Sequence, residues 1–117
     1  MRIEIRKTDD DTVARLCVGL VTLALGLPHR DVFNHADRAG DTVMIRQLAL
    51  YLLYNVCEMS QSRLGAIFAR DRTTVRYACN AVEDQRDYDV FDRMIDRLED
   101  DLRAIVKLPQ SLAEEMA

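Results

Sequence analysis

Residues 60–83, which read SQSRLGAIFARDRTTVRYACNAVE, decide the fold that we predict for this chain. Ser60 and Asp71 are residue types whose side chains accept hydrogen bonds from the unpaired amides of a first helical turn. Each is followed by apolar residues at helical spacing, first Leu64, Ile67 and Phe68 and then Val75, Ala78, Cys79 and Val82. The second segment keeps a polar and basic opposite face. Two short capped helices joined by a brief break are typical of a helix-turn-helix that reads DNA.

Further helices are expected on both sides of this motif. Apolar repeats predict helices at residues 10–25, 42–57 and 88–106, with a short helix at residues 30–34 and a loop at residues 35–41. The helix at residues 42–57 is apolar nearly all round, so we expect it to be central or to lie at an interface. Pro109 is expected to end the last helix.

A single helical domain is therefore predicted at residues 10–107, between an N-terminal arm at residues 1–9 and a flexible tail at residues 108–117. The chain has 117 residues, and its four glycines and two prolines leave long uninterrupted stretches, which favours an all-α architecture. Ile3 and Ile5 alternate with polar residues, so the arm could be a strand, a fraying segment or a contact with a partner or DNA.

Several functional classes lack their sequence signals. The chain contains no apolar run of about 18 residues and no signal-peptide layout, so we expect a cytoplasmic, nucleoid-associated protein with no membrane contact. Cys17, Cys57 and Cys79 lack metal-site spacing and are expected to be buried free thiols. His29 and His35 are expected at the surface. With no catalytic constellation in the sequence, we predict neither enzyme activity nor a cofactor nor a metal.

Charge is distributed unevenly along the chain, whose net charge is −4. Residues 60–81 contain four arginines and one acid, whereas residues 87–101 contain seven acids and two arginines. Because DNA contact is local, a basic face can coexist with an acidic back. The acidic helix is interpreted either as the solvated side of an amphipathic helix or as a surface that binds a partner.

A set of spaced matches between residues 46 and 83 resembles a known family. The matches are Arg46-Gln47, Ser60, Leu64-Gly65, Phe68, Arg70-Asp71, Thr73-Thr74-Val75, Ala78 and Val82-Glu83. They are similar to the C-terminal DNA-binding domain of the bacterial chromosomal replication initiator DnaA, and weaker similarity extends back to about residue 10. The resemblance implies a compact all-helical fold of the Trp-repressor-like kind, with the second motif helix in the major groove.

By position, the resemblance implies a set of DNA contacts. Base edges would be met by Asp71, Arg72 and Thr73, phosphates by Arg70 and Thr74, the DNA backbone by Gln61, Ser62 and Arg63, and the minor groove by Arg46. We add Arg76 and Tyr77, which share the outer face of the same helix. Three features depart from the family pattern. Arg72 replaces a usual histidine, which would favour guanine; one residue is missing between Phe68 and Arg70; and the basic loop before the Arg-Gln pair is lost.

The leading hypothesis is a sequence-specific regulator of transcription that binds double-stranded DNA. Analogy with the family suggests activation of a phage-like or gene transfer agent gene cluster. One alternative is a replication modulator that competes for initiator boxes. Another is a protein-interaction adaptor with a decayed helix-turn-helix, docking through Tyr51, Tyr54 and the acidic helix. Expected partners are double-stranded DNA, a homodimer mate, and transcription machinery or a co-activator at the acidic C-terminal helix.

Overall fold

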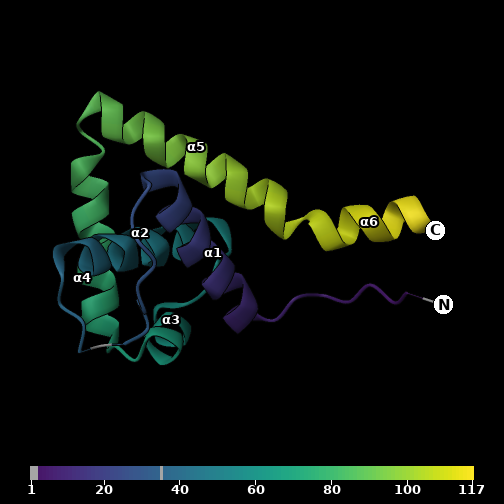
Figure 1. Ribbon diagram of the computed structural model, residues 1–117, viewed down its shortest axis with the longest axis horizontal. Helices are drawn as coiled ribbons and strands as arrows, with labels where there is room; N and C mark the ends of the chain where they lie inside the picture. Colours follow the sequence, from purple (N-terminus) through teal and green to yellow (C-terminus); the bar gives the residue numbers. More distant parts are fainter. Residues whose placement is uncertain (1–2, 35) are drawn as a thin grey trace.

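The computed structural model describes residues 3–34 and 36–117, and six helices form in these residues (Figure 1). They are α1 (Asp10–Leu25), α2 (Gly40–Val56), α3 (Gln61–Phe68), α4 (Arg72–Gln85), α5 (Asp89–Val106) and α6 (Leu108–Met116). No strand occurs in the described part of the chain, which confirms the all-α prediction. None of the described helices is long and apolar enough to span a membrane.

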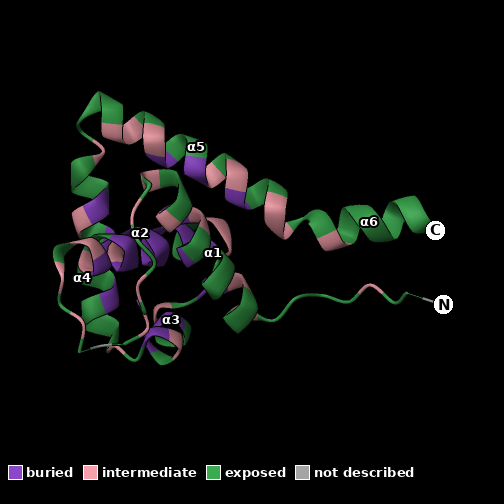
Figure 2. Cartoon of the chain, in the orientation of Figure 1, coloured by how far each residue is buried: buried purple, intermediate pink, exposed green. Residues whose placement is uncertain are grey.

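Helix α2 is the centre of the molecule, as its apolar sequence predicted. It packs against α1, α3, α4 and α5, and it is coloured as buried along most of its length (Figure 2). Its buried residues include Ile45, Leu48, Leu52 and Leu53, none of them more than 1% exposed. Burial of a leucine or isoleucine side chain contributes about 1.5–3 kcal/mol, so α2 supplies much of the apolar stabilisation.

The ends of α1 follow the signals in its sequence. The Thr12 backbone amide donates to the Asp9 carboxylate at 2.8 Å, so Asp9 caps the N-terminus. Gly26 ends the helix in the left-handed region at φ 65°, a conformation that glycine adopts without a Cβ clash. The predicted bounds of residues 10–25 are therefore confirmed.

The segment between α1 and α2 corrects one prediction. Residues 30–34 form a turn rather than a short helix. Val32 is nevertheless buried, and the Phe33 ring stacks on Phe68 at 4.8 Å between centroids. The Asp37 carboxylate accepts from the Ala39 amide at 3.0 Å and from the Thr42 hydroxyl at 3.1 Å. These bonds bring the start of α2 forward to Gly40, and His35 lies outside the described residues.

The C-terminal segment corrects a second prediction. Pro109 does not end a helix but lies in the first turn of α6, where its missing amide removes no intrahelical hydrogen bond. Residues 108–116 are therefore helical, whereas we expected a tail without regular structure. At the other end of the chain, residues 3–9 form no helix or strand. The arm and α6 project from the same side of the molecule, away from α3 and α4 (Figure 1).

An arginine at the end of α4 organises the acidic side of α5. The Arg86 guanidinium donates to Asp92 at 2.6 Å, to Glu99 at 3.0 Å and also to Asp96. It reaches the Tyr51 hydroxyl at 3.1 Å, which in turn donates to Glu83 at 2.7 Å. Burial opposes the charge of Arg86, but its hydrogen bonds outweigh burial and raise its pKa above the ordinary value. Part of the acidic run is thus an internal ion-pair network.

This network also decides the role of two tyrosines. Tyr51 is buried, and burial together with the bond to Glu83 raises its pKa. It is therefore not available for docking, which corrects that part of the adaptor hypothesis. Tyr54 is 41% exposed.

Candidate nucleic-acid interface

Both predicted helix caps of the motif are present. The Ser60 hydroxyl accepts from the Arg63 amide at 3.1 Å, and the Asp71 carboxylate accepts from the Thr74 amide at 2.7 Å. Between them, Ala69 adopts a left-handed conformation at φ 54°, and the Arg70 amide donates to the Gly65 carbonyl at 2.9 Å. The break between α3 and α4 is therefore a defined tight turn that fixes the start of α4.

Gly65 is required by this turn. A Cβ atom built on Gly65 would lie 2.5 Å from the Arg70 carbonyl oxygen, a backbone atom that cannot move without changing the turn. The close neighbour of Gly65 is therefore the backbone that links the two helices of the motif.

Gly65→Ala is expected to lower the free energy of unfolding by about 1–3 kcal/mol, because the new methyl group overpacks the turn. Helix propensity alone would make the alanine variant more stable by about 1 kcal/mol. A loss of stability would therefore identify the steric clash in the turn. The matched control is Gly19→Ala in α1, where a Cβ would meet nothing within 4 Å. Urea denaturation should show Gly19→Ala neutral or stabilising; the same sign for both changes would contradict the role given to Gly65.

Helix α4 has two distinct faces. Its inner face buries Val75, Ala78, Cys79 and Val82. The outer face exposes every residue of α4 that we selected, together with its cap: Asp71, Arg72, Thr73, Thr74, Arg76 and Tyr77. Tyr77 is 70% exposed although its ring is large and apolar. The N-terminal turn of α4 is thus an open surface with hydroxyl, guanidinium and phenol groups.

The predicted site residues in α3 and in the turn differ in how far they are exposed. Ser62 and Arg63 are exposed, whereas Gln61 and Arg70 are half-buried. Arg63 forms an ion pair with Asp10 at the start of α1, at 3.2 Å. Because both side chains are substantially exposed, this pair contributes little to stability and leaves Arg63 able to change partner.

Arg46 is buried against the loop before α2. Only 6% of this residue is exposed, and its guanidinium donates to the carbonyls of Val32 at 3.1 Å, Asn34 at 3.4 Å and Asp37 at 3.5 Å. Burial, followed by the positive charge of Arg70, lowers its pKa below the usual arginine value. The side chain of Arg46 therefore holds the loop before α2, and its contact with the minor groove stays a prediction.

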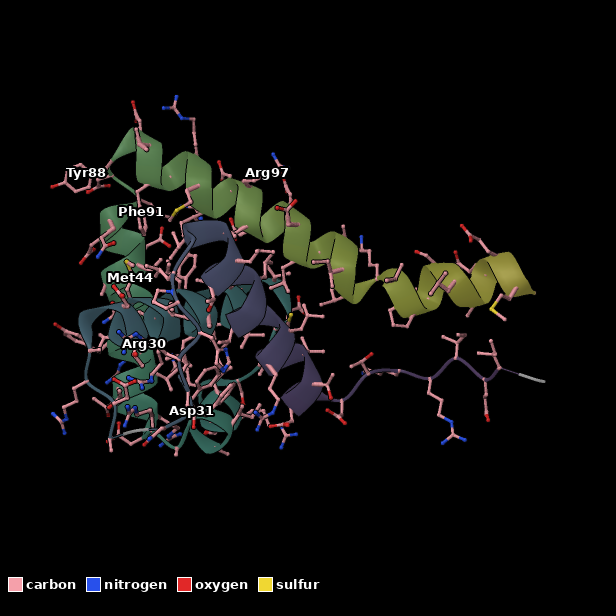
Figure 3. All side chains as sticks on the ribbon, viewed as in Figure 1. Arg30, Asp31, Met44, Tyr88, Phe91 and Arg97 are labelled. Atoms are coloured by element: carbon pink, nitrogen blue, oxygen red, sulfur yellow. The ribbon has the colours of Figure 1, made fainter. Side chains whose placement is uncertain are left out.

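That loop is a neighbour of the motif which sequence reasoning did not select. Phe33 stacks on Phe68 of α3, and the guanidinium of Arg15 lies 4.8 Å over the Phe33 ring. Arg30 is labelled in Figure 3; it lies 4.0 Å from Asp37, and its buried Nε has no hydrogen-bond partner. The signal for this packing was the apolar pair at residues 32 and 33, which we read as a short helix.

The Asp71 cap carries a pH dependence. Hydrogen bonding from Thr74 lowers the pKa of Asp71 below its ordinary value of 3.8. A lowered folded-state pKa means that the contribution of the cap is fully present above the unfolded value and is lost as pH falls through the folded value. The start of α4 should therefore be intact at neutral pH and weaken in acid.

Asp71→Asn is expected to retain the capping of α4 at neutral pH, since asparagine caps as well as aspartate, and to lose its acid-dependent part. Circular dichroism during acid titration should show a shallower loss of stability below the ordinary pKa of 3.8 than in the parent chain. Asp71→Ala should remove the cap at every pH. An acid profile of Asp71→Asn identical to that of the parent would contradict this assignment.

Among the described residues, no group of three or more His, Cys, Asp or Glu side chains could hold a metal ion. Cys17, Cys57 and Cys79 are free; Cys17 and Cys79 are buried and Cys57 is half-buried. Burial raises the pKa of Cys79 to about 11, which suppresses the reactive thiolate.

Comparison with known proteins bears on this interface. Residues 18–82 match the family described as bacterial dnaA protein helix-turn-helix. The chain is also similar to the chromosomal replication initiator protein DnaA of Synechococcus sp. (strain JA-2-3B'a(2-13)), with 32% identity over 78 residues. That match covers 65% of this chain but 17% of the relative. No solved structure matches the chain.

Proposed function

Because the chain belongs to the bacterial DnaA helix-turn-helix family, we propose that it binds double-stranded DNA sequence-specifically through α4. The observation that carries the proposal is the outer face of α4, which exposes Arg72, Thr73, Arg76 and Tyr77 beside a capped helix N-terminus. Such a helix fits the major groove, where residues of its first turns reach base edges.

The proposed roles follow from chemistry and exposure. Arg72 pairs with the O6 and N7 acceptors of a guanine, and Thr73 contacts a base or a thymine methyl group. Asp71 lies beside them and accepts from a cytosine amino group with the carboxylate oxygen that does not cap α4. Thr74, together with the amides of the first turn, binds phosphate. Arg63, Ser62 and Gln61 lie along the DNA backbone.

Regulation of transcription is the function that we propose for this binding. A role in activating a phage-like or gene transfer agent gene cluster is a narrower form of the proposal and rests on family analogy alone. Few cations face outward from the motif, and the net charge is −4. We therefore expect weak non-specific affinity with a shallow salt dependence, so that binding is lost readily as salt rises.

The test is selection of bound sequences from a random duplex pool, followed by gel-shift titration of the enriched site. A defined enriched sequence supports specific binding, and absence of any retained duplex in low salt overturns the proposal. An enriched sequence equal to the initiator box would favour the alternative of a replication modulator. The adaptor alternative loses support from the structure, because Tyr51 is buried and three acids of α5 bind Arg86.

A further inference from the structure

Helix α6 has an apolar stripe that this chain does not cover. Leu108, Leu112 and Met116 are spaced four residues apart, so they share one face of the helix. They are 52%, 40% and 58% exposed, and no residue of α6 is buried. A helix of nine residues is marginal in water on its own. Its stripe is therefore suited to packing against another apolar surface.

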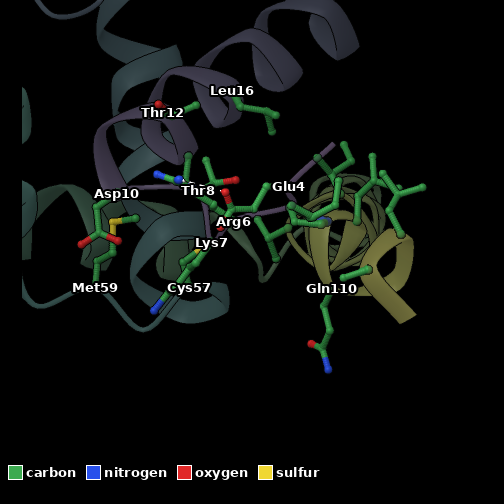
Figure 4. Close-up of a pocket in the computed structure, with 18 residues that line it drawn as sticks. Glu4, Arg6, Lys7, Thr8, Asp10, Thr12, Leu16, Cys57, Met59 and Gln110 are labelled. Atoms are coloured by element: carbon green, nitrogen blue, oxygen red, sulfur yellow. Dashed lines mark hydrogen bonds and ion pairs between the residues drawn. The ribbon is translucent and has the colours of Figure 1, made fainter. Parts of the chain in front are cut away.

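A groove beside α6 offers such a surface. It has a volume of about 890 Å³ and is bounded by the arm, the first turns of α1, and the α5–α6 junction (Figure 4). Its apolar lining residues include Val13, Leu16, Met59, Ile105, Val106 and, from the α6 stripe itself, Leu108 and Leu112. Leu16 is 41% exposed although it lies on α1, whose neighbouring apolar residues are core.

We propose that the occupant of this groove is α6 of a second copy of the chain, so that the protein forms a symmetric dimer. Helix α6 itself borders the groove, which means that one two-fold operation places each α6 beside the groove of the other copy. The same surface then serves both copies. The dimer buries both leucine stripes and both grooves at once.

Charge complementarity supports a second copy as the occupant. Arg6 and Lys7 of the arm line the groove together with the acids Glu4 and Asp10. Each of these acids already pairs with an arginine of its own chain, so Lys7 is the cation left over. Helix α6 carries two acids, Glu114 and Glu115, and no basic residue. In an antiparallel arrangement the acidic end of one α6 approaches the basic arm of the partner. Arg6 pairs with Glu4 of its own chain at 3.0 Å. Because both side chains are exposed, replacing this pair by one with a glutamate of the partner costs little free energy.

This dimer leaves the DNA-binding face free. The arm and α6 project away from α3 and α4, so docking at the groove does not cover the outer face of α4 (Figure 1). Dimerisation does not depend on DNA binding, because it uses a different surface, and the association of the chain is measured without DNA.

Sedimentation equilibrium of the full chain, without DNA, tests the proposal from low to high micromolar concentration. The parent chain should shift from monomer to dimer, and Leu112→Glu should remain monomeric across the range. The matched control is Leu23→Glu, since Leu23 is an 80% exposed leucine on α1 that does not border the groove. Thermal denaturation should show both variants folded, because both sites are exposed.

A charge exchange makes the site assignment specific. Glu114→Lys with Glu115→Lys should weaken association, and adding Arg6→Glu with Lys7→Glu should restore it. A parent chain that is monomeric at every concentration overturns the proposal. If Leu112→Glu dimerises as strongly as the parent chain, the interface lies elsewhere. The same conclusion follows if the variant with all four charge changes does not recover association.

Discussion

Arg86→Ala is expected to lower the free energy of unfolding by about 2–4 kcal/mol. The change leaves the Tyr51 hydroxyl, Glu99 and Asp92 without their shared cation at the contact between α2, α4 and α5. The side chain of Arg86 is 18% exposed and that of Glu99 is 13% exposed, so water replaces the lost bonds poorly. We place the cost below that of a fully buried pair because Asp96 is 58% exposed.

The matched control for this prediction is Arg97→Ala on the same acidic helix. Arg97 is 79% exposed, pairs with Asp101 at 3.2 Å and points away from the body of the molecule (Figure 3). A surface pair of this kind is worth about 0.3–0.5 kcal/mol. Urea denaturation of the two variants should separate them clearly. If both cost the same small amount, the Arg86 network is not a structural contact of the kind described.

The Arg86 network also shows that a charge pattern in a sequence does not reveal which residues its charges pair with. The acids of residues 87–101 predicted a solvated or partner-binding face, and the periodicity of α5 was correct. The cation that three of these acids bind comes from the end of α4, and α4 and α5 are joined by a sharp corner. Helical periodicity reports which residues share a face, but not which residue of another helix meets that face.

The helix-turn-helix was predictable because its signals are local. Ser60 and Asp71 cap within three residues of themselves, and the buried faces of α3 and α4 follow from helical spacing. Arg46 was not predictable in the same way. Its fate depends on the carbonyls of Val32, Asn34 and Asp37, which become acceptors because that loop forms no helix. The Asn34 carbonyl also accepts from the Asp37 amide at 3.1 Å, and the Arg46 guanidinium adds donors that no helix supplies to this loop.

Proline was misread for a related reason. A proline breaks a helix where its residue would have to donate an amide hydrogen bond to the carbonyl four residues earlier. Lys107 already ends α5, and Pro109 then falls in the first turn of α6, where no such bond is needed. The sequence signal was the same for both outcomes. The spacing of Leu108 and Leu112, which places them on one face, suits the separate helix α6.

Arg72→Ala is expected to weaken binding to the selected duplex by roughly 5- to 150-fold, which corresponds to about 1–3 kcal/mol. Arg72 is the first residue of α4 and is exposed, so its removal leaves the fold and the Asp71 cap in place. A bidentate contact to guanine is lost at one base pair. The parent should therefore prefer guanine at that position, and the variant should accept all four bases there.

Arg63→Ala is the matched control, because it removes a proposed phosphate contact and not a base contact. Arg63 lies at the start of α3 and is proposed to contact phosphate, so its loss should weaken all duplexes alike. For Arg63→Ala, the plot of log affinity against log salt should become shallower by about 1, because one phosphate contact is lost, and the base preference should be unchanged. Arg72→Ala should instead change base preference. If the two variants behave alike on every duplex, Arg72 does not read a base directly.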